Sequence, residues 1–525
     1  MVRCVTFEIR WHDTLPIYSC AFQPIAAARL QHVLDHNFGQ AAGLVPGQTL
    51  SSADGGAVQP LQAGGQSWRL ATAGGDNNVR LWMVHPNVPS PAAIAAATGN
   101  ARPLPPRTEY LATLSRHTGV VNAVRFSPGG DVLASAGDDG MVLLWVRSNR
   151  AFERDMSADV DERYEKETWR VRSVVRVTAQ EVYDLAWSPD GMFLAAGGTD
   201  FCVRVINIHK GAVVREINDH QHYVQGLAWD PRGEFLATES SDRSMHVYRG
   251  AAVHAKSAKI GTDESASGVH AEAVDGAPAA VGEQRGAPPP PPIAAGALLR
   301  TAPPAQRMYG DDRYSGFFRR LGWSPDGALL AAPSGQFAST GKPVGAVYIY
   351  GRASLSVAVP LAVLPGHKAV TLVVRFSPIL YELRGAASAF ALPYRMVYAV
   401  ATQESVFVYD TQQSTPLYCF SNLHYAPFTD LAWSADGHTL MMSSTDGYCS
   451  VAVFDYNELG VPLALDKQPC LEVRIPVGGK VPAEPAAPNA QLEAAVQPPI
   501  QPAPDPQRAG PKKRRVALTF EGPLQ

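Results

Sequence analysis

A short cassette recurs along most of this chain. It consists of an aromatic residue, a small polar residue, usually a proline, and a glycine within the turn that follows. Six copies lie at residues 126–130, 187–191, 229–233, 323–327, 376–378 and 433–437, the fifth without its glycine. Several are followed by an apolar run, a pair of small residues, an aspartate and then an aromatic six positions later. A unit that returns in this way predicts a repeat architecture.

The copy between residues 110 and 145 shows what one unit contains. Four apolar runs, at residues 111–114, 121–126, 132–135 and 141–145, are separated by turns rich in proline, glycine and aspartate. This pattern predicts four short strands in one antiparallel sheet. Pro128 cannot donate a ladder hydrogen bond, so the second strand is expected to end before it.

A histidine and an aspartate accompany the strands of this unit. We expect Asp139, in the tight turn, to reach His117, and Ser135 and Trp145 to complete a hydrogen-bonded tetrad. Equivalent residues recur as His12, Asp76 and Trp82; Asp200 and Ile206; His220, Asp242 and Tyr248; and His424 and Asp446. Because the pairs recur beside the same kind of turn, they are expected to be structural fasteners and not catalytic acid–base pairs.

The pattern resembles the WD-repeat family, in which each copy is one blade of a β-propeller. First inner strands are expected to begin near residues 17, 121, 182, 224, 318, 372 and 428. The fold class is therefore all-β, a seven-bladed WD40 propeller, and residues 5–10 are expected to supply the last outer strand and close the ring. Blade six carries Gln403 in place of the aspartate and blade five has none, so both should be less regular.

Seven blades of roughly 40 to 45 residues account for only part of the 525 residues. The predicted organisation is a propeller over residues 1–460 and a tail over residues 476–525. Insertions are predicted at residues 26–66, 86–108, 148–168 and 251–306. The longest of them and the tail are rich in alanine and proline, a composition that cannot bury enough apolar surface to order itself.

Several function classes lack their sequence signals. The net charge of −3 indicates no global attraction to nucleic acid, and no HExxH, GxSxG or paired-cysteine motif is present. We therefore predict no catalytic residue, metal, cofactor or small-molecule substrate. The six cysteines show no disulfide framework, which favours reduced thiols in an intracellular protein. No apolar run suits a membrane, and residues 335–343, a near miss to a phosphate loop, fit a hairpin loop better.

Longer strings carry a more specific resemblance. Residues 181–187, 195–207, 219–226, 317–321 and 424–455 are similar to the middle WD-repeat subunit of chromatin assembly factor 1, and the similarity runs from residue 1 to about residue 455. It implies a nuclear, non-enzymatic histone chaperone subunit that helps deposit histones H3 and H4 during replication-coupled nucleosome assembly. The implied partners are the large and small subunits of that complex. An alternative is a substrate receptor of a cullin ubiquitin ligase or another nuclear scaffold, suggested by the WDxR string at residues 229–232.

The end of the tail combines a basic cluster with alternating apolar residues. It contains Lys512, Lys513, Arg514, Arg515, Val516, Leu518 and Phe520. The stretch at residues 511–520 resembles the B-domain-type motif that binds the anti-silencing-function histone chaperone, where the apolar residues could add a strand to a sheet edge. A nuclear import signal explains the basic cluster equally well, and both roles remain open.

Partner contacts on the propeller are expected just before each inner strand and just after each tight-turn aspartate. The candidates in these positions are Phe201, Tyr223, Arg243, Phe318, Arg319, Tyr425 and Phe428. Aromatic and arginine side chains make good anchors when exposed, although each aromatic could equally belong to the core. The acidic residues within 153–167 are a second candidate for holding basic histones, with a solvated linker as the alternative.

Overall fold

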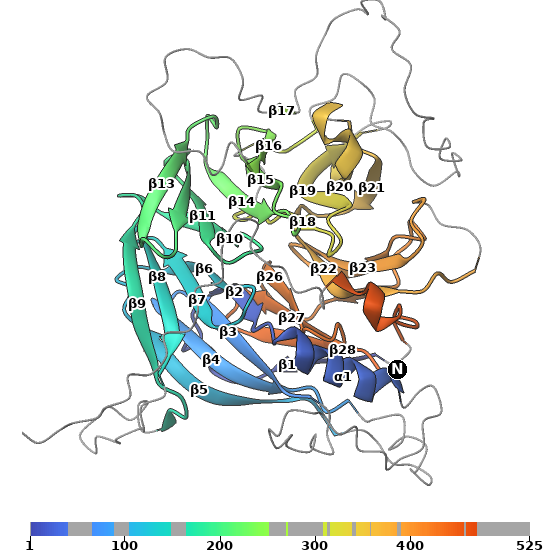
Figure 1. Cartoon of the computed structure of the whole chain (residues 1–525), viewed down its shortest axis with the longest axis horizontal. Coiled ribbons are helices and arrows are strands. Elements are labelled where there is room, and N and C mark those ends of the chain that lie inside the picture. Colours follow the sequence, from blue (N-terminus) through green and yellow to red (C-terminus); the bar gives the residue numbers. More distant parts are fainter. Residues whose placement is uncertain are drawn as a thin grey trace, which may run out of the picture. The chain divides into compact units, whose positions relative to one another are not determined.

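A computed structural model shows seven four-stranded antiparallel sheets arranged around one axis (Figure 1). It describes residues 2–39, 66–88, 104–148, 164–250, 269–270, 308–311, 316–338, 343–357, 359–385, 390–455 and 458–469. The innermost strand of each sheet contacts the innermost strand of the next, and the seventh contacts the first. The predicted seven-bladed propeller is therefore confirmed.

The first four blades follow the chain in order from the axis outward. Blade one contains β2 (Ile17–Phe22), β3 (Trp68–Gly74), β4 (Asn78–His85) and β5 (Arg107–Ser115). Blade two contains β6 (Val121–Phe126), β7 (Val132–Gly137), β8 (Met141–Arg147) and β9 (Trp169–Arg176). Blade three contains β10 (Val182–Trp187), β11 (Phe193–Gly198), β12 (Val203–Asn207) and β13 (Ala212–Ile217). Blade four contains β14 (Val224–Trp229), β15 (Phe235–Ser240), β16 (Met245–Arg249) and β17 (Val269–His270).

The remaining blades are less uniform, and the seventh uses both ends of the propeller sequence. Blade five contains β18 (Gly322–Trp323), β19 (Leu329–Phe337), β20 (Val344–Gly351) and β21 (Ala362–His367). Blade six contains β22 (Thr371–Tyr381), β23 (Arg395–Thr402), β24 (Ser405–Asp410) and β25 (Tyr418–Ser421). Blade seven contains β26 (Phe428–Trp433), β27 (Thr439–Ser444), β28 (Cys449–Val453) and β1 (Arg3–Phe7). The part of the chain that the structure describes also contains the short 3-10 helices η3 (Arg352–Val357) and η4 (Leu465–Lys467).

The sequence repeat and the blade are offset by one strand, which corrects the expectation that residues 111–145 form one sheet. The first run of that repeat lies in β5, which pairs with β4 of blade one, whereas the next three runs are β6, β7 and β8 of blade two. The loop after β5 crosses from the outer edge of one blade to the axis of the next. Each repeat therefore links two neighbouring sheets.

The N-terminal strand closes the ring. β1 pairs antiparallel with β28, from Arg3 opposite Val453 to Phe7 opposite Cys449, and so forms the outer strand of blade seven. The strand covers residues 3–7 and not 5–10, since the chain turns away after the buried Phe7. The two ends of the propeller sequence thus share one sheet, which leaves β28 with no open edge.

One helix lies where an unstructured insertion was expected. Helix α1 (Ala27–Gly39) occupies the start of the predicted insertion at residues 26–66 and buries Leu30, Val33 and Leu34. Their spacing of three and four residues is that of one helix face. Leu30 and Leu34 pack into the core of blades six and seven, while Val33 packs into the core of blades one and seven. The helix therefore reinforces the closure (Figure 1).

Blade five departs most from the repeat, and the position predicted from the sequence for its inner strand is wrong. The expected start near residue 318 falls before β18, which has only two residues. The backbone of residues 319 and 320 bonds instead to Gln225 and Leu372, in the inner strands of the neighbouring blades. Blade five also has a register shift between Ala332 and Gly335, where Ser334 has a φ of 56°.

The folded body continues past the expected boundary at residue 460. Leu463 and Gln468 hydrogen bond to Leu380 in β22, so the segment around η4 packs on blade six. The predicted tail at residues 476–525 and most of the insertions lie outside the described residues. No helix among the described residues has the length and apolar character needed to cross a membrane.

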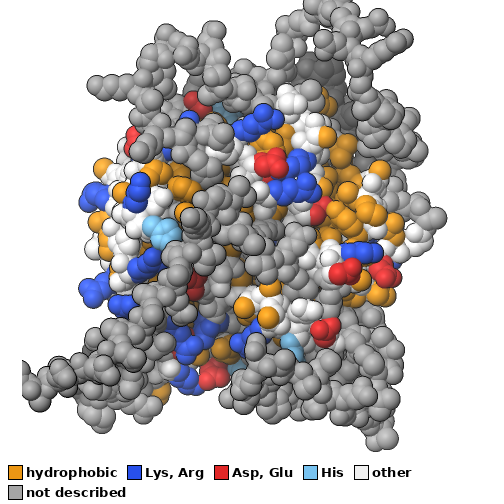
Figure 2. All heavy atoms as spheres, viewed as in Figure 1, with side chains coloured by type: hydrophobic (Ala, Val, Ile, Leu, Met, Phe, Trp, Pro, Cys, Tyr) orange, Lys and Arg blue, Asp and Glu red, His pale blue; other side chains and the backbone are white. Residues whose placement is uncertain are grey.

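The outer strands carry charge along their open edges. On β9, Arg170, Arg172 and Arg176 alternate with less exposed residues and point to solvent. Lys and Arg side chains gather over β9 and β13 at the left of Figure 2. Charged side chains on an outer strand disfavour pairing with another chain, which protects a sheet edge from aggregation.

Candidate functional site

The histidine and aspartate residues singled out in the sequence lie together within blades. In blade two, His117 Nδ1 lies 2.8 Å from Asp139 and its Nε2 lies 2.7 Å from the hydroxyl of Ser135, which also accepts a hydrogen bond of 2.8 Å from Trp145. Blade one has the same arrangement of His12, Asp76, Thr72 and Trp82. Blade four has His220, Asp242 and Thr238. The polar groups of each fastener use their hydrogen-bonding capacity on one another, so they are not arranged to act on a substrate.

Burial and hydrogen bonding oppose each other in these fasteners. Burial alone would raise the pKa of Asp242, but hydrogen bonds from His220, Ser244 and the backbone of Gln221 lower it below its ordinary value. Burial is the largest influence on His12 and lowers the pKa of its imidazole. The aspartates are therefore held as carboxylates that accept hydrogen bonds.

The sixth repeat shows what happens when the aspartate is missing: its histidine, His367, ends β21 of blade five and packs against blade six, where Gln403 stands in place of the aspartate. His367 is buried, and its Nε2 has no hydrogen-bond partner within the described part of the chain. Burial lowers the pKa of His367 to about 4. Without a carboxylate, the histidine is a neutral packing group beside Phe407 and Tyr409.

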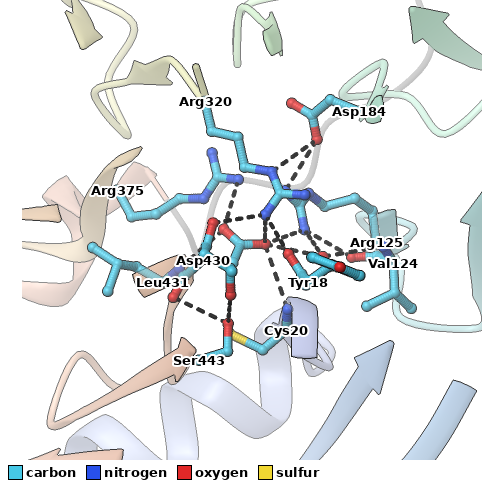
Figure 3. Close-up of polar contacts among 12 residues, drawn as sticks. Tyr18, Cys20, Val124, Arg125, Asp184, Arg320, Arg375, Asp430, Leu431 and Ser443 are labelled. Atoms are coloured by element: carbon cyan, nitrogen blue, oxygen red, sulfur yellow. Dashed lines mark hydrogen bonds and ion pairs between the residues drawn. The ribbon is translucent and has the colours of Figure 1, made fainter. Parts of the chain in front are cut away.

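Charged side chains from several blades meet at the axis of the ring (Figure 3). Arg320 is fully buried and lies 3.0 Å from Asp430 and 3.5 Å from Asp184. Arg125 bridges the same two aspartates at 2.8 and 3.1 Å, and Arg375 lies 3.3 Å from Asp430. Three guanidinium groups thus share two carboxylates, an arrangement that sequence spacing did not reveal.

The axial network also binds the backbone of distant strands. Arg320 donates hydrogen bonds of 2.8, 3.1 and 2.7 Å to the carbonyls of Tyr18, Thr429 and Asn122, which lie in blades one, seven and two. Burial lowers the pKa of Arg320 to about 10, while Asp430 opposes this effect. Burial would raise the pKa of Asp430, but the three arginines hold it well below its ordinary value. The positive and negative charges of the network pair with one another, and the network joins several blades, so its role is structural.

Three of the predicted rim contacts are core residues, which corrects the prediction. Phe318 and Arg319 are 1% exposed and Phe428 is 2% exposed. The guanidinium of Arg319 bonds to the carbonyls of Ser240, Gly310 and Asp311 in the interior. Phe428 packs into the core of blades six and seven, and the Phe318 ring lies 3.9 Å from the buried Arg320 guanidinium.

The other predicted rim residues reach the surface on the side of the ring where the inner strands begin. Phe201 and Tyr223 are each 38% exposed, and their rings lie 5.8 Å apart. Tyr425 is fully exposed beside the fastener of blade seven. Arg243 pairs with Asp311 at 2.6 Å.

The structure adds aromatic residues that sequence patterns did not single out. Tyr183 lies 6.3 Å from Tyr223 and 4.8 Å from Phe317, and Phe317 lies 5.9 Å from Tyr18, measured between ring centres. Phe317 is 48% exposed, so solvent reaches this row of rings at Phe317 as well as at Phe201 and Tyr223. Tyr18 and Tyr183 hold equivalent second positions of inner strands, a signal that could have identified them.

Other sequence candidates have structural partners. Asp230, in the WDxR string, is fully buried and accepts two hydrogen bonds of 3.0 and 2.7 Å from Arg352 of η3. Gly335 lies within β19, opposite Ala346 of β20, and does not precede a helix, as the glycine of a phosphate loop would. Of the acidic insertion, Glu165 and Glu167 are described and contact Thr113 and Arg69 of blade one.

The residues of the basic tail, from Lys512 to Phe520, and most of the acidic insertion lie outside the described residues. Among the residues that the structure does describe, no group of three or more His, Cys, Asp or Glu side chains could hold a metal ion. The fold and its fasteners together define a WD-repeat β-propeller.

Comparisons with known proteins show which WD-repeat proteins this chain is similar to. A family model described as the CAF1B/HIR1 β-propeller domain matches residues 50–272 and 297–459. The CAF1B-type subunit of chromatin assembly factor 1 from Mus musculus is 34% identical over 90% of this chain and 70% of its own length. The corresponding subunit from Schizosaccharomyces pombe is 38% identical over 75% of this chain and 83% of its own length. Protein HIR1 of Candida albicans is 28% identical over 76% of this chain and 40% of its own length.

The chain belongs to the CAF1B/HIR1 β-propeller family. The resemblance to the WD-repeat subunit of chromatin assembly factor 1 is thereby confirmed, since identity of 34% or more extends over most of the chain in relatives of that name.

Proposed function

We propose that this chain is the non-enzymatic WD-repeat subunit of a histone chaperone complex that deposits histones H3 and H4 during replication-coupled nucleosome assembly. Its partners in this proposal are a large and a small subunit of chromatin assembly factor 1, and it acts in the nucleus. The observation that carries the proposal is the similarity to a chromatin assembly factor 1 subunit over 90% of the chain. The internally compensated charges at the axis and in the fasteners fit a scaffold.

Affinity purification from S-phase nuclei tests this proposal. We expect a large chaperone subunit, a second WD-repeat protein and histones H3 and H4 to accompany the tagged chain. A preparation from non-replicating nuclei is the matched control and should contain less histone. Recovery of a cullin adaptor without histones would instead support the ubiquitin-ligase alternative and refute the proposal.

We further propose that the tail binds the anti-silencing-function histone chaperone. Val516, Leu518 and Phe520 alternate as a strand does, and Lys512 to Arg515 could pair with acidic side chains beside a sheet edge. Replacing the three apolar residues with alanine should abolish chaperone binding in a pull-down and leave nuclear import intact. Replacing the four basic residues with glutamine is the complementary variant and should reduce both. If the alanine variant binds normally, the strand-addition model is wrong.

A further inference from the structure

Two neighbouring blades carry bulky residues where the turn geometry favours glycine. In five blades, a residue just after the tight-turn aspartate has a positive φ; these residues are Asn77 (63°), Gly140 (69°), Phe201 (66°), Arg243 (72°) and Gly447 (85°). Glycine adopts this conformation without strain, whereas a side chain as large as phenylalanine makes it unfavourable. Strain retained at Phe201 points to a role for its side chain.

Phe201 belongs to a continuous aromatic surface. Its ring contacts Tyr223 at 5.8 Å and stacks on His222 at 5.6 Å. Tyr223 continues to Tyr183, which is nearly buried and forms the floor. Phe201 and Tyr223 flank this floor and expose more than a third of their surface. The arrangement presents ring edges and faces to an incoming group.

Carboxylates surround these rings. A hollow on this face of blades two, three and four is lined by Asp138, Glu181, Asp200, Tyr183, Phe201 and Tyr223, together with Ala179, Gln180 and Thr199. None of its lining residues is lysine or arginine. Asp200 is paired with Arg204, Asp138 accepts a hydrogen bond from Asn122, and Glu181 accepts one from the Tyr183 hydroxyl. Two carboxylates therefore face the hollow without a cationic partner at hydrogen-bond distance among the described residues.

We propose that this hollow, which we call the acidic aromatic groove, binds a lysine- or arginine-bearing segment of a partner protein. An ammonium or guanidinium group placed over Tyr183 and between Phe201 and Tyr223 would gain cation–π attraction from the rings and Coulombic attraction from Glu181 and Asp138. A nucleic acid backbone would be repelled by the same carboxylates. A purely apolar peptide would desolvate them without compensation.

This inference deepens the proposed function, on which the choice of occupant rests. Histones H3 and H4 are basic proteins, and their N-terminal tails are extended segments rich in lysine and arginine. In this proposal, the propeller therefore contacts the basic histones of the complex directly, through the groove. The sequence alone left open whether such a contact exists.

Binding of labelled peptides to the full chain tests the groove. The probes are fluorescent N-terminal tail peptides of histones H3 and H4, and the same peptides with every lysine and arginine replaced by glutamine. We expect the native peptides to bind and the glutamine peptides to bind at least roughly ten-fold more weakly. Equal binding of both kinds, or no binding of either, would overturn the inference.

Two variants locate the binding. Phe201→Gly should weaken binding by roughly ten-fold without lowering the melting temperature, because glycine relieves the left-handed turn. Glu181→Gln should weaken binding and flatten its dependence on salt. Asn77→Gly is the matched control, since it changes the equivalent left-handed turn of blade one, which does not line the groove, and should leave affinity unchanged. Equal affinity in Phe201→Gly, Glu181→Gln and the unchanged chain would place the peptide elsewhere and refute the proposal.

Two further outcomes separate this inference from the proposed function. If a peptide of residues 508–522 of this chain is the sole binder, the groove holds the chain's own tail and the inference fails. If the purified complex contains histones but the tail peptides do not bind the groove, the inference fails while the proposed function stands. If the peptides bind through Phe201 but no chaperone complex is recovered, the groove stands and the proposed function fails.

Discussion

Each fastener concentrates several hydrogen bonds on one hydroxyl. In blade two, Ser135 joins His117 and Trp145, all of them buried. We expect Ser135→Ala to lower the free energy of unfolding by about 1–3 kcal/mol, because the buried Trp145 Nε1–H loses its acceptor and the buried His117 Nε2 loses its hydrogen-bond partner. Urea unfolding measures the difference. Ser173→Ala, on the outer strand β9 of the same blade, is the control and should change stability by less than about 0.5 kcal/mol. Equal effects of the two changes would contradict the role assigned to Ser135.

The isolated histidine at the end of β21, His367, should make stability depend on pH. Burial lowers the pKa of His367 to about 4 from an ordinary value of 6.5. Between these values the unfolded chain binds more protons than the folded one, so stability is full above pH 6.5 and falls as the pH falls. At about pH 5 the loss through this group should be about 2 kcal/mol relative to neutral pH.

The variant His367→Leu isolates that contribution. Other buried histidines also titrate, so the comparison is the loss of unfolding free energy between about pH 7 and pH 5 in each protein. The variant should lose about 2 kcal/mol less than the unchanged chain over this interval. An identical loss in both would mean that His367 does not remain neutral in the folded state.

Local patterns in the sequence predicted the positions of strands, which depend on interactions between residues close together in the chain. Alternating apolar residues and turn residues located the inner strands that begin at Ile17, Val121, Val182 and Val224. They did not predict exposure: Phe318 and Tyr223 were both expected at or just before the start of an inner strand, yet Phe318 is buried and Tyr223 is exposed. Burial depends on how the backbone turns after a loop, which no pairwise spacing specifies.

At the scale of elements, helix α1 and strand β1 secure the same seam. The helix was missed because its three buried residues lie in an alanine-rich stretch before a low-complexity insertion, where composition dominated the interpretation. Strand β1 was found because alternation is strong and the seventh sheet lacked a partner. Its pairing with β28 buries Phe7, which contributes about 1.5–3 kcal/mol by removing apolar surface from water.

Deleting residues 2–7 should therefore open blade seven. The edge of β28 would be exposed, so amide hydrogen exchange should rise across Cys449–Val453, and light scattering should detect self-association. Adding a synthetic peptide of residues 1–10 is the control and should restore slow exchange. If β28 remains protected in the deletion variant without the peptide, β1 does not close the ring.

At the scale of the whole molecule, Arg320 joins parts of the chain that are hundreds of residues apart. Its side chain, which comes from the segment before blade five, bonds to carbonyls or carboxylates of blades one, two, three and seven. Such a contact forms only after the ring has assembled. This explains why sequence spacing did not predict the network, although each of its residues lies on or beside an inner strand.

Arg320→Met tests whether the axis holds the ring together. The change leaves Asp184 and Asp430 with fewer cations and removes the donor from three buried carbonyls, so the free energy of unfolding should fall by about 3–5 kcal/mol. Arg320→Lys keeps the charge but cannot form the forked hydrogen bonds, and its loss should be intermediate. Arg172→Met, on the exposed face of β9, is the control and should change stability by less than about 0.5 kcal/mol.

The same variant should reveal how the blades depend on one another. Because Arg320 contacts several inner strands at once, its loss should raise hydrogen exchange in β2, β6 and β26 together, and not in blade five alone. A rise confined to blade five, or a change in unfolding free energy no larger than that of Arg172→Met, would show that the sheets are stabilised pairwise and that the axial network is dispensable.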